Sequence, residues 1–230
     1  MEFAALSSPL RVAVINCEDA EKWSDHVQVL QTAYGRAGDE WVEYEARRRR
    51  HDLCSRRSRV HRYRAWLNEF PDDAALARLD AVVCPGSRHS ATDDSLPWLA
   101  SLLETLRRVA YQSSVQLLCI CFGHQALARA LGGDVSKNPA GAGFRYVAET
   151  IRCAPGWRRA LTGEDGEDAE EEEEEIVLLE SHGDCVCGLP PKAICLASSP
   201  GAAHEIVVVG STVLSYQSHP EFTSDPASSR

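Results

Sequence analysis

The sequence contains no apolar run that approaches the about 20 residues needed for a membrane-spanning helix. Its first ten residues, MEFAALSSPL, lack both the positively charged region and the long apolar region of a secretory signal. These absences exclude a helical membrane protein and predict a cytoplasmic chain that has no membrane partner.

The nine cysteines lack the C-x2-C spacing of common structural zinc sites. Their close pairs, Cys119/Cys121 and Cys185/Cys187, are both separated by one residue. A metal site is the obvious alternative for a chain rich in Cys and His, but this spacing disfavours it, and we assign no metal. Because no secretory signal is present, we expect reduced thiols and no disulfide framework.

Acidic residues are concentrated in one segment, residues 164–175, which holds ten acids and no base. Outside it the chain has 24 acidic and 24 basic residues, so the net charge of -10 belongs to this segment. Such a run repels itself and has nothing to bury, which predicts a disordered surface insertion. A regulatory or partner-binding role is the alternative.

A basic segment, residues 47–64, holds nine arginines and one acid. Arginine clusters can bind phosphates or act as an import signal. No RNA- or DNA-binding motif accompanies this one, and the chain as a whole is acidic, so we do not expect a nucleic-acid partner. The default interpretation is a solvated helix or loop.

The 230 residues, 44% of them hydrophobic, fit one large α/β domain over residues 1–230. Short β-branched or apolar runs occur at residues 11–15, 81–84 and 116–120, and each is followed by Gly or Pro or by a tight turn. These runs predict buried parallel strands. Helical patterns lie between and after them, at residues 25–34, 98–111 and 125–131. This alternation predicts a doubly wound, mostly parallel, flavodoxin-like sheet with helices on both faces. After about residue 145, short runs predict an antiparallel section with strands at residues 176–179, 193–197, 205–209 and 212–217.

The sharpest local motif is residues 117–125, LLCICFGHQ, in which an apolar strand enters a tight turn and then a helix. This is the pattern of a nucleophile elbow, which presents one side chain beside a helix N-terminus. The helix dipole and free N–H groups there favour the thiolate of Cys121, while Gly123 permits close backbone approach. The alternative is that Cys121 is an inert buried thiol, as Cys84 and Cys119 are expected to be.

A second motif, His219-Pro220-Glu221, supplies a base and a carboxylate to orient it. In extended backbone, residues two apart point to the same side, so the two side chains can meet. A carboxylate there would fix the imidazole tautomer and support the imidazolium that forms on proton uptake. An ordinary surface histidine is the alternative, and we assign no chemistry to the remaining candidates His89, His124 and His204.

CFGHQ followed by a distal HPE resembles the class I glutamine amidotransferase family, and the resemblance extends from Arg11 to Phe222. The stretch from Gly86 to Trp98 is more similar to the stand-alone subgroup that contains plant γ-glutamyl peptidases than to biosynthetic amidotransferases. The resemblance implies a Cys121 nucleophile with His219 and Glu221 completing a triad.

The same resemblance implies roles for the residues around the nucleophile. The backbone N–H groups of Gly86 and Phe122 would form an oxyanion hole. Gln125 would help to hold the glutamine, and Ser181 and His182, in the segment SHGDCV, would lie beside the substrate.

Three features depart from the family pattern. Cys119 stands where the family usually has a small residue, the acidic segment has no family counterpart, and only nine residues follow Glu221. The last feature implies truncation or shortening after residue 222, and it supports an alternative function, a catalytically inactive binding or scaffold protein.

The expected activity is cysteine-dependent hydrolysis of a γ-glutamyl amide through a γ-glutamyl thioester, without a cofactor. The substrate would be glutamine or a γ-glutamyl peptide. Because no second domain is expected to accept ammonia, glutamine as substrate would require a separate synthetase subunit.

Overall fold

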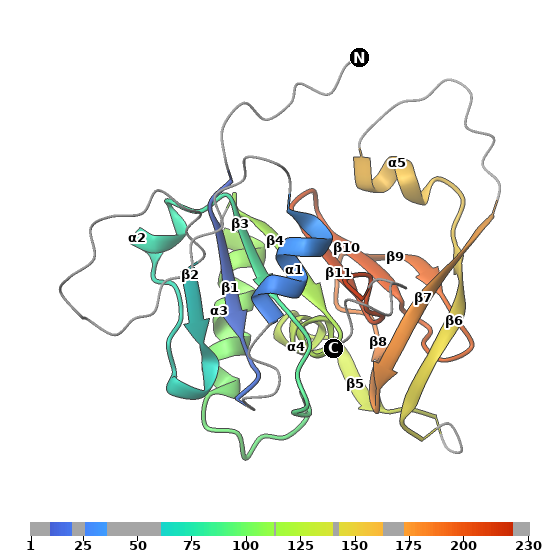
Figure 1. Cartoon of the computed structure of the whole chain (residues 1–230), viewed down its shortest axis with the longest axis horizontal. Helices are drawn as coiled ribbons and strands as arrows, with labels where there is room; N and C mark the ends of the chain where they lie inside the picture. Colours follow the sequence, from blue (N-terminus) through green and yellow to red (C-terminus); the bar gives the residue numbers. More distant parts are fainter. Residues whose placement is uncertain are drawn as a thin grey trace.

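The computed structural model describes residues 10–19, 26–35, 61–112, 114–139, 143–162 and 173–222. Within these residues, nine strands form one sheet in the order β2-β1-β3-β4-β11-β10-β9-β6-β7, and two further strands pair as β5-β8 (Figure 1). The chain is therefore an α/β protein with one large mixed sheet.

The first half of the sheet is parallel. Its strands are β2 (His61–Arg64), β1 (Val12–Asn16), β3 (Ala81–Cys84), β4 (Gln116–Ile120) and β11 (Val213–Tyr216). Every residue of β1 is buried, as expected for a parallel strand covered on both faces.

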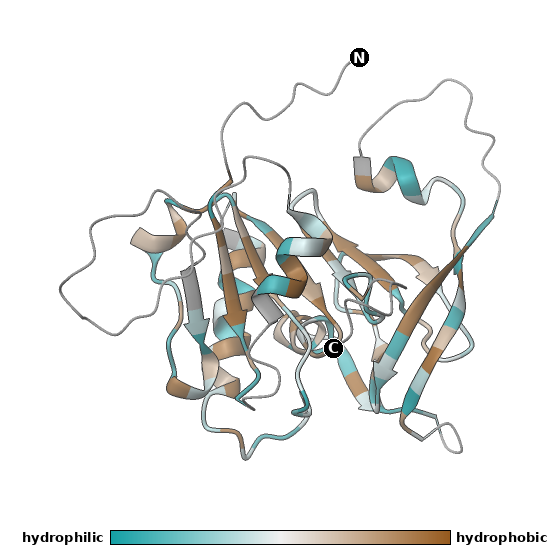
Figure 2. Cartoon of the chain, in the orientation of Figure 1, coloured by the Kyte–Doolittle hydropathy of each residue, from teal (hydrophilic) through white to brown (hydrophobic). Residues whose placement is uncertain are grey.

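Helices cover both faces of this parallel half. Alternate residues of β1 point to opposite sides, so Ala13 and Ile15 pack in one core cluster with residues of α3 (Leu99–Gln112) and α4 (Phe122–Ala130). Val12 and Val14 pack in another cluster that includes Leu30 of α1 (His26–Tyr34). The apolar strands at the centre of the sheet stand out in Figure 2.

The second half of the sheet is antiparallel. It comprises β10 (Ile206–Val209), β9 (Ala193–Ser198), β6 (Arg145–Cys153) and β7 (Glu174–His182). Strands β5 (Asp134–Lys137) and β8 (Asp184–Gly188) form the separate ribbon. The short helices are η2 (Ala65–Leu67), α2 (Asp73–Leu76) and α5 (Trp157–Thr162).

The predicted fold class is confirmed: parallel strands alternate with helices, and an antiparallel section follows. No helix among the described residues has the length and apolar character needed to cross a membrane.

Two charged segments differ from the sequence interpretation where the structure describes them. Residues 61–64 of the arginine-rich stretch form β2 and not a solvated helix or loop, because parallel pairing with β1 incorporates them into the sheet. Glu174 and Glu175, which were expected in the acidic loop, belong to β7, where Glu174 accepts hydrogen bonds from Trp157 Nε1 at 2.9 Å and Arg158 Nε at 2.8 Å. The remaining parts of the two segments, 47–60 and 164–172, and residues 223–230 lie outside the described residues.

Candidate active site

Cys121 occupies a sharp turn between β4 and α4. Its φ of 49° and ψ of −103° lie in a region that residues other than glycine rarely adopt. The backbone fixes this turn, because the Cys121 N–H donates to the Tyr216 carbonyl at 2.7 Å and its carbonyl accepts from the Gln125 N–H at 3.0 Å. A Cβ at Gly123 would lie 2.0 Å from the Cys84 carbonyl oxygen, so only glycine lets α4 approach β3 here.

His219 follows β11, the neighbour of β4 in the sheet. Its ring Nδ1 lies 2.7 Å from Glu221 Oε1, and its ring stacks on Phe222 with centroids 4.5 Å apart and planes 4° apart. The His219 N–H donates to the Leu179 carbonyl at 2.8 Å, which ties this segment to β7. The histidine is therefore held from its ring and from its backbone.

The ring of His219 lies against Cys121 and Gly86. A Cβ at Gly86 would be 2.9 Å from His219 Cε1 and 3.6 Å from Cys121 Cβ. Burial alone would lower the pKa of His219, but charge and hydrogen-bond interactions with Cys121, and then with Glu221, outweigh it and raise the pKa well above its ordinary value. The electrostatics therefore favour an imidazolium beside Cys121.

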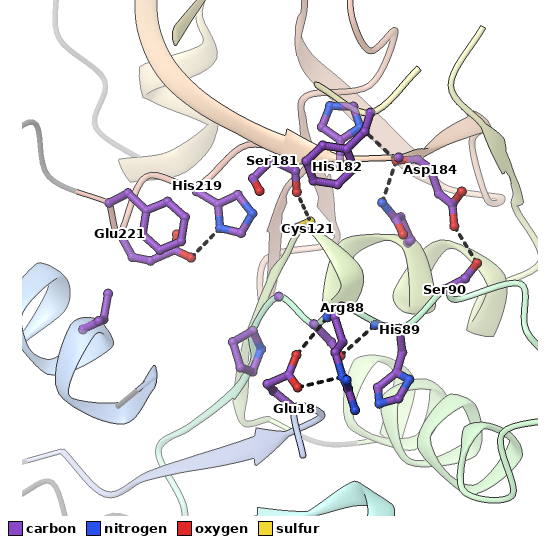
Figure 3. Close-up of a pocket in the computed structure, with 18 of the residues that line it drawn as sticks. Glu18, Arg88, His89, Ser90, Cys121, Ser181, His182, Asp184, His219 and Glu221 are labelled. Carbon is purple, nitrogen blue, oxygen red and sulfur yellow. Dashed lines mark hydrogen bonds and ion pairs between the residues drawn. The ribbon is translucent and has the colours of Figure 1, made fainter. Parts of the chain in front are cut away.

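A cavity of about 380 Å³ opens over these residues (Figure 3). Seven of the sequence-predicted site residues line it: Gly86, Cys121, Gln125, Ser181, His182, His219 and Glu221. Phe122 is the first residue of α4, where backbone N–H groups have no partner within the helix. Its side chain is buried against Trp98, with ring centroids 6.0 Å apart.

The three residues expected beside the substrate use their polar groups differently. The Ser181 carbonyl faces Cys121, whose Sγ donates to it at 3.6 Å. Gln125 Nε2 donates to the Asp184 carbonyl at 2.8 Å and to Gln217 Oε1 at 3.2 Å. The amide nitrogen of Gln125 thus fixes the first residue of β8.

His182 faces protein groups at both ring nitrogens, and its hydrogen bonds are made at Nδ1. Its Nδ1 lies 3.0 Å from Asn138 Oδ1 and 2.9 Å from the Asp184 carbonyl, and its Nε2 lies 3.1 Å from Glu180 Oε2. The geometry therefore makes this ring a support of the 181–184 segment, although the residue borders the cavity.

Sequence reasoning assigned no role to two buried carboxylates on the cavity wall. Asp184 is buried, accepts from Ser90 Oγ at 2.5 Å and pairs with Lys137 Nζ at 2.7 Å. Glu18 is also buried and pairs with Arg88. Glu18 could have been found from the pattern alone, because ligands of parallel sheets bind at the carboxyl ends of strands and Glu18 lies two residues after β1.

His124, to which no role was assigned, is buried and does not line the cavity. Burial, followed by the nearby His204, lowers its pKa to about 3, so the ring stays neutral. Its Nδ1 lies 2.9 Å from Ser215 Oγ. It therefore joins α4 to β11.

Three carboxylates away from the cavity, those of Glu149, Glu180 and Glu205, lie within 4.8 Å of one another. Arg145 pairs with Glu149 at 2.6 Å, and burial, followed by the charge of Glu180, raises the pKa of Glu205 to about 8. A proton on Glu205 and the guanidinium together reduce the charge of this cluster without a metal ion.

The family model described as glutamine amidotransferase class-I matches residues 49–230, which include the elbow, Gly86 and the His219-Pro220-Glu221 segment. The chain belongs to the class I glutamine amidotransferase family. Among the relatives of this chain, Gamma-glutamyl peptidase 3 from Arabidopsis thaliana is 27% identical over 217 residues, covering 94% of this chain and 77% of the relative. Gamma-glutamyl peptidase 4 from the same plant is 30% identical over 165 residues, covering 71% of this chain and 62% of the relative.

A match to a larger protein covers a shorter part of the chain. A GMP synthase [glutamine-hydrolyzing] from Alkalilimnicola ehrlichii is 33% identical over 123 residues, which are 52% of this chain and 22% of that protein.

Solved structures share the fold of this chain. A glutamine amidotransferase from Thermotoga maritima superposes with a TM-score of 0.65 at 16% identity, covering 92% of this chain and 76% of that one. A glutamine amidotransferase from Methylobacillus flagellatus superposes with a TM-score of 0.59 at 20% identity, covering 94% of this chain and 71% of that one. The resemblance stated from the sequence motifs is thereby confirmed at the level of the family and the fold.

Proposed function

We propose that this chain hydrolyses a γ-glutamyl amide, with Cys121 as nucleophile, His219 as general base and acid, and Glu221 as the group that orients the histidine. The observation that carries the proposal is Cys121 held at positive φ beside an imidazole whose far nitrogen lies 2.7 Å from a buried carboxylate. A thiol beside a base that is itself oriented by a third group is the arrangement of an activated nucleophile.

In the first step, the Cys121 thiolate attacks the γ-carbonyl carbon, and the carbonyl electrons move onto oxygen. Gly86 adjoins both Cys121 and His219, and Phe122 begins α4, so their N–H groups are suitably located to stabilise the oxyanion. The imidazolium of His219 then protonates the departing nitrogen as the tetrahedral intermediate collapses to a γ-glutamyl thioester.

In the second step, His219 removes a proton from water, which attacks the thioester carbonyl. Collapse of this second intermediate releases glutamate and returns the sulfur as a thiolate beside the imidazolium. Glu221 acts throughout by keeping Nδ1 of the ring protonated, which leaves Nε2 to exchange the proton.

The leaving group distinguishes two substrate classes. Glutamine would release ammonia and require a separate synthetase subunit to use it, whereas a γ-glutamyl peptide would release a peptide or an amino acid. Relatives named γ-glutamyl peptidases, matched over as much as 94% of this chain, favour the peptide class. Both classes yield glutamate, so glutamate release from glutamine and from glutathione, measured side by side, assigns the substrate.

The nucleophile is tested by brief exposure to an electrophilic glutamine analogue and peptide mapping by mass spectrometry. We expect selective labelling of Cys121 although eight other cysteines are present, because buried thiols such as Cys119 have raised pKa values. Free glutamine should compete with the label, and Glu221→Gln should slow it.

Cys121→Ala is the control variant, and it should abolish labelling and glutamate release together. Labelling that spreads over several cysteines, or that persists in Cys121→Ala, would reject the catalytic assignment. The chain would then be better described as an inactive binding or scaffold protein.

A further inference from the structure

A buried carboxylate lies on the cavity wall outside the proposed set of catalytic side chains. Glu18 follows β1, and only 2% of its side chain is exposed. In Figure 3 it lies on the other side of Cys121 from Ser181. Since burying a carboxylate is unfavourable unless hydrogen bonds compensate for lost water, the partners of Glu18 indicate what it does.

Both carboxylate oxygens of Glu18 contact one residue. The backbone N–H of Arg88 donates to Oε2 at 3.0 Å, and the Arg88 side-chain Nε lies 3.2 Å from Oε1. The first contact fixes the path of the main chain, and the second fixes the side chain.

The neighbouring residue is tied to the same loop. Ser87 Oγ donates to the Cys17 carbonyl at 2.8 Å, so two consecutive residues after β3 are bonded to two consecutive residues after β1. Residues 85–87 belong to no helix or strand, and these side-chain bonds therefore hold the loop across the cavity wall.

The loop held in this way carries Gly86, which adjoins the reacting groups. A Cβ added at Gly86 would lie 2.9 Å from His219 Cε1. The backbone here has little room to shift toward the histidine, and a shift away would withdraw the Gly86 amide from the elbow.

We infer that Glu18 is a positioning residue that holds the Gly86 amide in the oxyanion hole by fixing the main chain at Arg88. This inference rests on the proposed γ-glutamyl hydrolysis. It assigns Glu18 an effect on the tetrahedral intermediates and none on the nucleophilicity of Cys121.

Asp19, the residue after Glu18, provides a matched comparison. Its carboxylate contacts the same guanidinium, with Oδ1 2.5 Å from Arg88 Nη2, but through the side chain and not through the backbone N–H. Asp19→Asn therefore weakens the charge pairing of Arg88 while it leaves the main-chain bond from Arg88 to Glu18.

The experiment measures glutamate release from glutamine and glutathione in the full-length chain. Glu18→Ala should lower kcat about 10- to 100-fold with KM within about threefold, since a small misplacement of a transition-state donor costs that much. Glu18→Gln should recover most of the loss because its amide oxygen can still accept the Arg88 N–H. Asp19→Asn should stay within about twofold of the natural chain, as expected for an exposed ion pair.

Alkylation of Cys121 by iodoacetamide separates positioning from general damage. That reaction occurs at a saturated carbon and forms no oxyanion, so its rate should be the same in Glu18→Ala and in the natural chain. Unchanged kcat in Glu18→Ala, alkylation that falls in parallel with kcat, or equal loss in Asp19→Asn would each overturn the inference while the proposed function stands.

Ser87→Ala provides a second measurement should Glu18→Ala fail to fold. This variant removes the hydrogen bond from Ser87 Oγ to the Cys17 carbonyl and should lower kcat with little change in KM. An unchanged kcat in Ser87→Ala would also overturn the inference. If the natural chain releases no glutamate and the glutamine analogue does not label Cys121, the proposed function fails and this inference fails with it.

Discussion

Cys121 combines a thiol side chain that lines the cavity with a backbone conformation that is unfavourable for its type. A positive φ at a residue with a Cβ persists only where the surroundings enforce it. Here a bond to β11, a bond within α4 and the glycine at position 123 enforce it together. The strained residue is thus the point at which three elements meet, and its side chain is directed into the cavity.

The charge of His219 depends on its two neighbours, which makes its pKa a test of the site. Replacing Glu221 by glutamine removes a negative charge 2.7 Å from Nδ1 and should lower the raised pKa of His219 toward the ordinary value of about 6.5. NMR titration of the labelled histidine rings measures the shift, and the spectrum of His219→Gln identifies the resonance among eight histidines. An identical titration in both proteins would contradict the described geometry.

The same raised pKa predicts how stability varies with pH. A group that binds its proton more tightly in the folded state stabilises that state. Its contribution to the free energy of unfolding is full below the unfolded pKa, about 6.5 for histidine, and is lost as the pH rises through the folded pKa. The stability difference between the natural chain and His219→Gln should therefore shrink with rising pH over this window. Urea unfolding at a series of pH values measures it.

Individual residues differ in how far their sequence context specifies them. Cys121, His219 and Glu221 could be proposed because their motifs are short and chemically specific, and the structure brings all three together. His182 could be placed beside the site, but its partner Asn138 could not be assigned, because the pairing of β5 with β8 brings that residue to it. Glu180 precedes His182 by two residues on β7 and lies on the same side of the strand. The catalytic roles stay predictions until the labelling experiment is done.

At the scale of elements, the close approach of α4 to β3 is what allows the elbow to form. Gly123→Ala would place a methyl group 2.0 Å from the Cys84 carbonyl, so we expect a loss of about 3 kcal/mol or more in unfolding free energy and loss of glutamate release. Gly183→Ala is the matched control for stability, since its nearest contact would be Phe144 Cδ2 at an ordinary 3.4 Å. Equal thermal midpoints for the two variants would show that the elbow tolerates displacement.

Elements with strong internal patterns were predictable, and those defined by their neighbours were not. Strands β3 and β4 were placed at their observed bounds because apolar runs ended by clear turns leave little choice. Strand β2, with the sequence HRYR, has no strand pattern of its own and is extended because it pairs with β1. Most of β6 is exposed, so its sequence carried little periodic signal.

At the scale of the whole molecule, the protection of backbone amides against hydrogen exchange should decrease from the centre of the sheet to its edge. Strand β4 is paired on both sides, with β3 and β11, whereas β7 lies at the edge and pairs only with β6 among the described strands. Amide hydrogen exchange followed by mass spectrometry should therefore be slowest in β4 and β11 and faster in β7. Faster exchange in β4 than in β7 would contradict this order.

The position of β11 has a consequence for the order in which the protein is made. Residues 213–216 insert between β4 and β10, in the middle of a sheet whose other described strands all precede them in the chain. During synthesis the cysteine elbow leaves the ribosome well before its neighbouring strand and the histidine that follows it, and a domain generally folds as a unit. Under the proposed function, Cys121 is therefore without its base until 98 further residues have been added, and γ-glutamyl hydrolysis is expected only once β11 has filled the gap between β4 and β10.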